Sequence, residues 1–145
     1  MFNFLKKNKE TEKKLENNTE LLSKTASLLI HAAKMDQKYS DEEKEIIKKT
    51  MLELGCKQNS INEMLIIAEK NESNSNQILD FTRKVKNTDD SFKTKLIEAL
   101  WKIIFSDNKA DMYESSLMRR LAGLLYLDNK TVGDIKEQVR KKLNQ

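Results

Sequence analysis

Leu96 to Leu125 read LIEALWKIIFSDNKADMYESSLMRRLAGLL, and this stretch decides the fold. Together with Phe92, its first part is apolar on more than half of a helix circumference, which predicts a central helix with Trp101 as a core anchor. Asp89 or Asp90 can cap the start of this helix. Asp107 to Ala110 interrupt the apolar pattern, and Asp111 to Glu114 form a capping pattern for the next helix. The stretch therefore predicts two helices joined by an acidic turn.

The same arrangement occurs earlier in the chain. A shift of 71 residues aligns AKMDQKYSDEEKEIIKK with IFSDNKADMYESSLMRR, so that Asp36 pairs with Asp107 and Glu43 with Glu114. In both copies an apolar helix, an aspartate turn and a capped helix follow one another in the same phase, which indicates an internal repeat. We expect two pseudo-symmetric helix-turn-helix halves packed about an approximate two-fold axis, in which the two aspartate turns can face each other.

Capping signals and apolar periodicity predict five further helices in a chain with three glycines and no proline. They run from about Leu21 to Met35, from Ser40 to Gly55, from Ser60 to the polar loop Asn71–Ser75, from Asn76 to Lys86, and from the cap Asp128 or Asn129 to Leu143. The fold class is therefore all-α, with about seven helices in one compact bundle. Residues 19–145 form a single domain, and residues 1–18 form a flexible or frayed N-terminal arm.

Composition excludes several classes of protein. A single cysteine, Cys56, excludes an internal disulfide, and neither a signal peptide nor a run of about 20 apolar residues is present, so we expect a cytoplasmic protein. Lysine supplies most of the 27 basic residues, which argues against nucleic acid as a partner because base and phosphate recognition usually enriches arginine. Membrane contact is expected at most through the arm, where Phe2, Phe4 and Leu5 precede lysines.

The chain resembles the TerB-like family of bacterial tellurite-resistance and stress gene clusters, a fold that also occurs in a membrane-linked DnaJ-type co-chaperone. The resemblance rests on LLIHAAKMDQKYSDEEKEII (Leu28 to Ile47), on DFTRKV (Asp80 to Val85) and on Leu96 to Leu125, in this order and spacing. It covers about residues 20–140. It implies an all-helical fold of about seven helices, no established enzymatic activity, and a divalent-metal site for Ca²⁺, Mg²⁺ or a similar ion.

Carried over by position, the metal-site residues are Asp36, Glu43, Asp107 and Glu114. The family pattern usually has glycine after each turn aspartate, whereas this chain has Gln37 and Asn108. Lys38 and Lys109 also place cations beside the proposed ligands, which lowers the affinity for a divalent cation.

A second interpretation of the four acidic residues is structural. Both glutamates stand where a capping box needs them, and both aspartates can act as ordinary turn residues. One aspartate and one glutamate per turn are too few for a hard cation unless the two turns converge or backbone carbonyls and water complete the shell. Both interpretations stay open at the level of the sequence.

Enzyme function is not expected. His31 is the only histidine, so every histidine-dependent site would have to use it, and its place beside the apolar residues Ala32 and Ala33 favours a packing role.

The sequence as a whole leaves two hypotheses for the function. The first is a stress- or tellurite-resistance-associated protein whose paired acidic turns hold a divalent cation. The second is a metal-free protein interaction module, co-chaperone-like or a scaffold, in which exposed apolar surface on the last helix or the arm binds another protein or a second copy of the chain.

Overall fold

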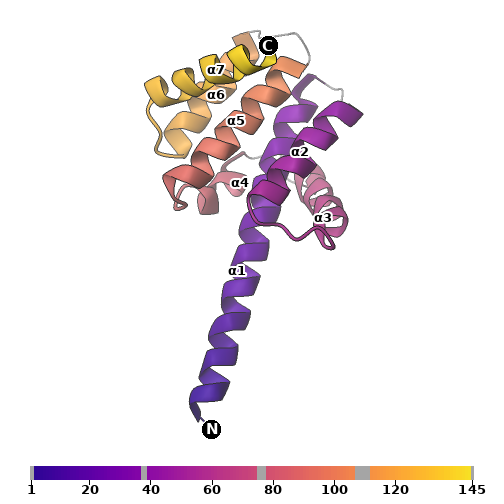
Figure 1. The fold of residues 1–145 in the computed structure, drawn as a ribbon, viewed down its shortest axis with the longest axis vertical. Helices are drawn as coiled ribbons and strands as arrows, with labels where there is room; N and C mark the ends of the chain where they lie inside the picture. Colours follow the sequence, from indigo (N-terminus) through magenta and orange to yellow (C-terminus); the bar gives the residue numbers. More distant parts are fainter. Residues whose placement is uncertain (1, 37–38, 75–77, 107–111, 145) are drawn as a thin grey trace.

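A computed structural model of the chain describes residues 2–36, 39–74, 78–106 and 112–144, with side chains described from residue 18 onward except those of Asp36 and residues 112–115. Seven α-helices and one short 3₁₀ helix make up this described part, which contains no strand (Figure 1). The all-α prediction is confirmed. The elements are α1 (Phe2–Ala33), η1 (Lys34–Asp36), α2 (Asp41–Glu53), α3 (Ile61–Asn74), α4 (Ile78–Val85), α5 (Asp90–Ser106), α6 (Met112–Leu124) and α7 (Asn129–Leu143).

The first helix is much longer than the sequence indicated. We expected it to begin near Leu21, but α1 runs without a break from Phe2 to Ala33, and its first half projects from the body (Figure 1). The physical reason is local, because this part of the chain is rich in lysine and glutamate, which favour helices, and contains no glycine or proline to end a helix. The position 18/19 is therefore not a helix boundary. The frayed state of the arm stays a prediction.

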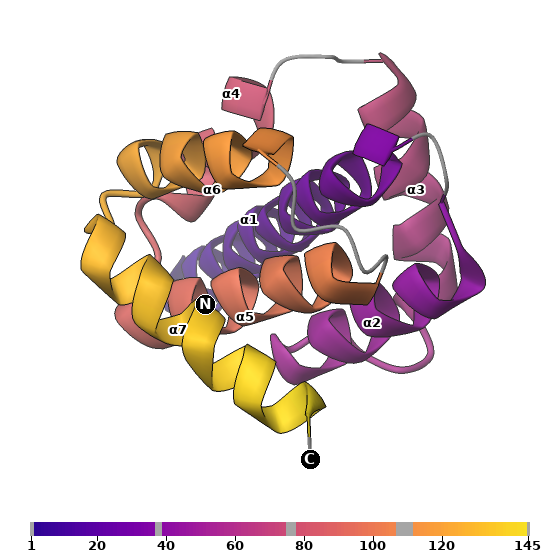
Figure 2. The same ribbon diagram turned by 90° about the horizontal axis from the view of Figure 1, so that it is seen from above.

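The core forms around the second half of α1 and around α5. Thr25 to Ile30 are buried on every side of α1, which contacts α2, α3, α4 and α5. Figure 2 shows α5 between α2 and α7, and the contacts of α5 with these two helices agree with that view. Trp101 is buried on α5, where its Nε1–H donates to the Val132 carbonyl of α7 at 3.1 Å. The predicted central place of α5 and the anchoring role of Trp101 are confirmed.

The internal repeat is visible in the way α2 and α6 end. After α2, Gly55 has φ +112°, and the Cys56 N–H donates to the Met51 carbonyl at 2.9 Å. After α6, Tyr126 has φ 59°, and the Leu127 N–H donates to the Ala122 carbonyl at 2.8 Å. Each pair of equivalent residues is separated by the shift of 71 found in the sequence. Both helices therefore end in the same left-handed motif, which provides hydrogen-bond donors for carbonyl groups at the end of each helix.

Other helix ends confirm some predictions and correct one. Asp89 accepts from the Phe92 N–H at 2.9 Å and begins α5, and Asp128 accepts from the Thr131 N–H at 2.6 Å and begins α7, as their capping patterns predicted. The loop predicted for Asn71–Ser75 is wrong at its start, because α3 continues to Asn74. This extra turn brings Glu72 into the interior, where it is 7% exposed.

Candidate functional site

Glu43, one of the four predicted metal-site residues, lies at the start of α2 and is fully buried. Its Oε1 accepts from the Ser40 backbone N–H and from the Ser40 hydroxyl, both at 2.9 Å. In return, the Glu43 N–H donates to Ser40 Oγ at 3.1 Å, which completes the capping box that the sequence predicted. This carboxylate therefore stabilises the first turn of α2 in the described fold.

A second buried carboxylate, Glu72 of α3, lies near the same turn. Lys34 Nζ of η1 donates to Glu72 Oε2 at 2.8 Å, and His31 Nδ1 of α1 lies 3.4 Å from Glu72 Oε1. The His31 ring is also tilted against the Phe81 ring, with centroids 6.1 Å apart. These contacts link α1 and η1 to α3. The positive charge of the Lys34 ammonium group already lies beside the Glu72 carboxylate.

The pKa of Tyr39 depends on the charges around this turn. Burial is the main cause that raises the pKa of Tyr39, and the carboxylates of Glu69, Glu43 and Glu72 raise it further. Lys44 Nζ lies 5.0 Å from the centroid of the Tyr39 ring. Three carboxylates therefore concentrate negative charge around one phenol at the first acidic turn.

The structure describes only part of the other three predicted metal-site residues. Asp36 ends η1 and Glu114 is the third residue of α6, but their side chains lie outside what the structure describes, as does the whole of Asp107. Among the described residues, no group of three histidine, cysteine, aspartate or glutamate side chains is placed to hold a metal ion. Whether the two turns converge, as a shared site would require, stays a prediction.

The described residues also give little support for catalysis. Cys56, buried just after α2, has its Sγ 3.6 Å from the Lys57 carbonyl, and burial raises the pKa of its thiol. This shift is the opposite of the one that activates a nucleophilic cysteine. Among the described residues, His31 contacts Glu72 and Cys56 contacts the Lys57 carbonyl, so these two side chains are not paired with each other as a base and a nucleophile would be.

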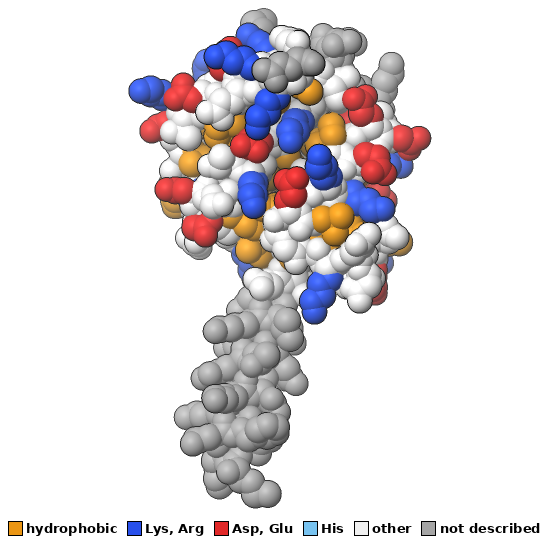
Figure 3. Space-filling view, viewed as in Figure 1, with side chains coloured by type: hydrophobic (Ala, Val, Ile, Leu, Met, Phe, Trp, Pro, Cys, Tyr) orange, Lys and Arg blue, Asp and Glu red, His pale blue; other side chains and the backbone are white. Residues whose placement is uncertain are grey.

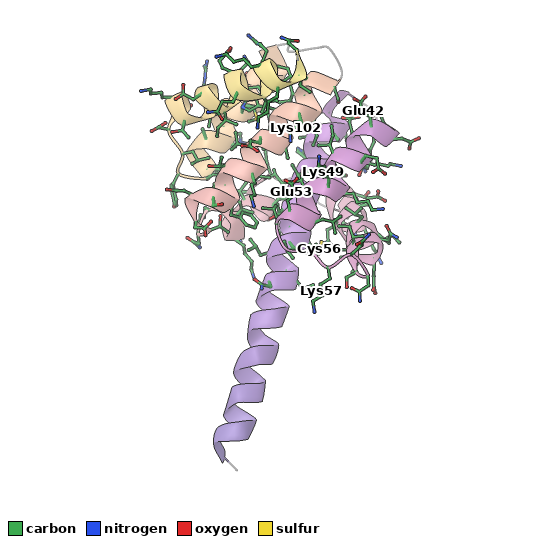
Figure 4. All side chains as sticks on the ribbon, viewed as in Figure 1. Glu42, Lys49, Glu53, Cys56, Lys57 and Lys102 are labelled. Carbon is green, nitrogen blue, oxygen red and sulfur yellow. The ribbon has the colours of Figure 1, made fainter. Side chains whose placement is uncertain are left out.

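The described residues also form surface grooves, and one of them lies where α1 leaves the body. This α1–α3 groove encloses about 480 Å³ and is lined by Leu22 of α1 and by Met64 and Ile67 of α3, with Cys56 and Lys57 at the turn between α2 and α3. Figure 4 labels the last two residues beside the point where α1 emerges. Ile67 is 46% exposed, so the groove presents aliphatic surface to solvent.

The second groove lies at the far end of the body, between α2, α5 and α7. This α2–α7 groove encloses about 730 Å³ and is lined by Glu42 and Ile46 of α2, Lys102, Phe105 and Ser106 of α5, and Arg140, Leu143 and Asn144 at the end of α7. Figure 4 labels Glu42 and Lys102, which come from different helices on the same face. Leu143 is 56% exposed, and Arg140 lies over the Phe105 ring at 5.6 Å.

Sequence reasoning missed Glu72 and both grooves. For Glu72 a signal was present, because Glu72 lies seven residues after Leu65 and four after Ala68 and so continues the inward face of the predicted third helix. The grooves carry no local signal, since each one is built from helices that are far apart in sequence.

The described part of the chain has no helix with the length and apolar character needed to cross a membrane.

Comparison with known proteins adds one finding. No curated protein and no solved structure matched the chain. The model of one family, described as tellurite resistance protein TerB, matches residues 22–137, which include the core half of α1, both repeats and most of α7. With this match over most of its length, and with the seven-helix fold that the resemblance implied, the chain belongs to the TerB family.

Proposed function

We propose that this TerB-family chain is a non-catalytic interaction module of the cytoplasm, which binds an amphipathic helix of a partner protein in the α1–α3 groove. The observation that carries the proposal is a contrast between two parts of the described molecule. The buried carboxylates Glu43 and Glu72 near the first acidic turn are engaged within the fold, Glu43 in a capping box and Glu72 in its contacts with Lys34 and His31. In the α1–α3 groove, by contrast, Ile67 is 46% exposed and Leu22 is half-buried, above the buried Met64.

The chemistry of the α1–α3 groove fits a helical ligand. Leu22, Met64 and Ile67 supply an apolar floor, and Lys57 and Glu63 stand at its edge with opposite charges. A helix that lays its apolar face into a groove uses the same kind of floor, with anchors at helical spacing. Ile66, next in sequence, is 67% exposed and extends the apolar surface of α3.

Site-specific photo-crosslinking tests this proposal. A benzophenone amino acid replaces Ile67 in the groove or Leu79 on α4, which is 41% exposed and does not line the groove. In the cells that encode the protein, we expect a discrete adduct with another protein from position 67 and none from position 79. Adducts that are the same from both positions, or absent from both, contradict the proposal.

A divalent cation at the acidic turns is the second candidate function. The observation that favours it is the negative charge at the first acidic turn, where, besides burial, the carboxylates of Glu69, Glu43 and Glu72 raise the pKa of Tyr39. Against it stand the nearby Lys34 and the use of Glu43 in the capping box. Hard cations need six or more oxygen ligands, of which water can supply several.

Thermal unfolding of chelator-treated protein separates the two candidates. A cation at about 100 times its dissociation constant stabilises the native state by roughly 2.7 kcal/mol, on the order of 5–10 °C for a domain of this size. If Ca²⁺, Mg²⁺, Mn²⁺ or Zn²⁺ raises the midpoint of the parent but not of the Asp36→Asn plus Asp107→Asn variant, the acidic turns bind metal. If no cation shifts either midpoint, the structural interpretation of these residues is supported.

A further inference from the structure

The α2–α7 groove differs from the α1–α3 groove in the charges along its two walls. The first turn of α2 is acidic, with Asp41, Glu42 and Glu43, and the first two of these are exposed. The last turn of α7 is basic, with Arg140, Lys141 and Lys142, all of them exposed. Figure 3 shows red side chains along the α2 edge of this face, blue side chains toward α5, and both colours on the α7 side.

No ion pair between described residues crosses this groove from Asp41 or Glu42 on one wall to Arg140, Lys141 or Lys142 on the other. Of the ion pairs between described residues, the one at this end of the molecule joins Arg140 to Glu137 of the same helix at 3.3 Å. Lys102 adds a further cation on the α5 side. One wall is therefore open to a cationic partner surface and the other to an anionic one.

The floor between the walls is apolar and incompletely covered. Ile46 and Phe105 line it and are half-buried, and Leu143 stands at its edge with 56% of its surface exposed. Val132, Ile135 and Val139 precede Leu143 on the inward stripe of α7 and are buried, so Leu143 is where this stripe leaves the core. An exposed leucine beside a hollow with an apolar floor has the form of one half of a reciprocal contact.

We propose that the α2–α7 groove is the interface of a two-fold symmetric homodimer of this chain. In such an interface the same patch is used twice, so the basic end of α7 of one copy meets the acidic start of α2 of the other, and Leu143 of each copy enters the groove of its partner. A second copy matches both walls at once. A ligand of one charge would match one wall and be repelled by the other, and this favours the second copy as the occupant.

This inference goes beyond the proposed function, because it uses a different surface and a different partner. Sedimentation of the full chain at low and high salt measures whether the chain dimerises and with what dissociation constant. We expect a dimer whose dissociation constant rises with salt, since charges at the rim of an interface are screened. Leu143→Asp gives a monomer, whereas the matched control Leu79→Asp on α4 leaves the dimer unchanged.

Charge reversal provides the decisive arm of the test. Asp41→Lys plus Glu42→Lys reverses the net charge of the first turn of α2, and Lys141→Glu plus Lys142→Glu reverses that of the last turn of α7. We expect each variant alone to dimerise at least about tenfold more weakly than the parent, and an equal mixture of the two to form a heterodimer of parental affinity, because both contacts then join opposite charges. Circular dichroism of each variant verifies that the helices are intact.

The opposite results are equally definite. A parent that is monomeric at every concentration overturns the proposal, as does a dimer that persists in Leu143→Asp and in both reversed variants. Reversed variants that are folded but fail to associate when mixed also overturn it. None of these outcomes bears on the α1–α3 groove, whose crosslinks at Ile67 report the proposed function separately.

Discussion

Removing the Ser40 hydroxyl tests whether the first acidic turn is built for stability. In the structure this hydroxyl accepts from the Glu43 N–H at 3.1 Å and donates to Glu43 Oε1 at 2.9 Å. Ser40→Ala loses the cap, at about 1 kcal/mol, and deprives a buried carboxylate of one donor, at about 1 kcal/mol more. We therefore expect the free energy of unfolding to fall by about 2 kcal/mol and the melting midpoint by about 4–8 °C.

The assay is thermal and urea unfolding followed by circular dichroism, in the presence of a chelator and again with each divalent cation. Ser60→Ala is the matched control, because Ser60 directly precedes α3, is exposed, and donates to Asn59 Oδ1 at 3.3 Å. We expect this control to change stability by less than about 0.5 kcal/mol. Equal effects of the two substitutions, or a loss in Ser40→Ala that occurs only with a cation present, would refute the structural role of the turn.

Three further substitutions test separate parts of the fold. The pKa of Tyr39 is raised in the folded state, so the tyrosine contributes its full stabilisation below the unfolded pKa of about 10 and loses it as the pH rises above that value. Urea titrations above a pH of about 10 should therefore show the free energy of unfolding of the parent falling by up to about 1.4 kcal/mol per pH unit more than that of Tyr39→Phe. Gly55→Ala should cost about 1–2 kcal/mol in thermal unfolding, and this cost is conformational, since φ is +112° and no atom lies within 4 Å of an added Cβ. Trp101→Phe should cost about 2–4 kcal/mol in the same assay because it removes the buried hydrogen bond from Trp101 Nε1–H to the Val132 carbonyl and creates a cavity. A loss below about 1 kcal/mol would contradict its anchoring role.

Much of the fold was predictable because its signals are local. The apolar residues of α5 and the caps Asp89 and Asp128 depend on positions a few residues apart, and the structure confirms them. Two ends were missed for physical reasons. The arm of α1 has good helix propensity but few apolar anchors, and the polar run after Asn71 resembled a loop although its first turn is fixed by the burial of Glu72.

The surfaces were less predictable than the fold. Leu143 completes an apolar stripe with Val132, Ile135 and Val139, and such a stripe indicates burial of every member. The structure buries the first three and leaves Leu143 exposed, because α7 extends past α5 at this end of the body. Sequence periodicity identifies the inward side of a helix, but only the tertiary arrangement decides where along the helix the neighbouring surface ends.

The two acidic motifs have a common position that does not depend on a metal. Glu43 is the third residue of α2, and α6 begins at Met112, so Glu114 is also the third residue of its helix. At this position a carboxylate can satisfy a free backbone N–H, as Glu43 does with Ser40. Helix starts built in this way require the same acidic pattern whether or not a cation is present. The presence of the pattern in a TerB-family chain is therefore weak support for a metal site, and only a cation-dependent change in stability distinguishes a ligand from a cap.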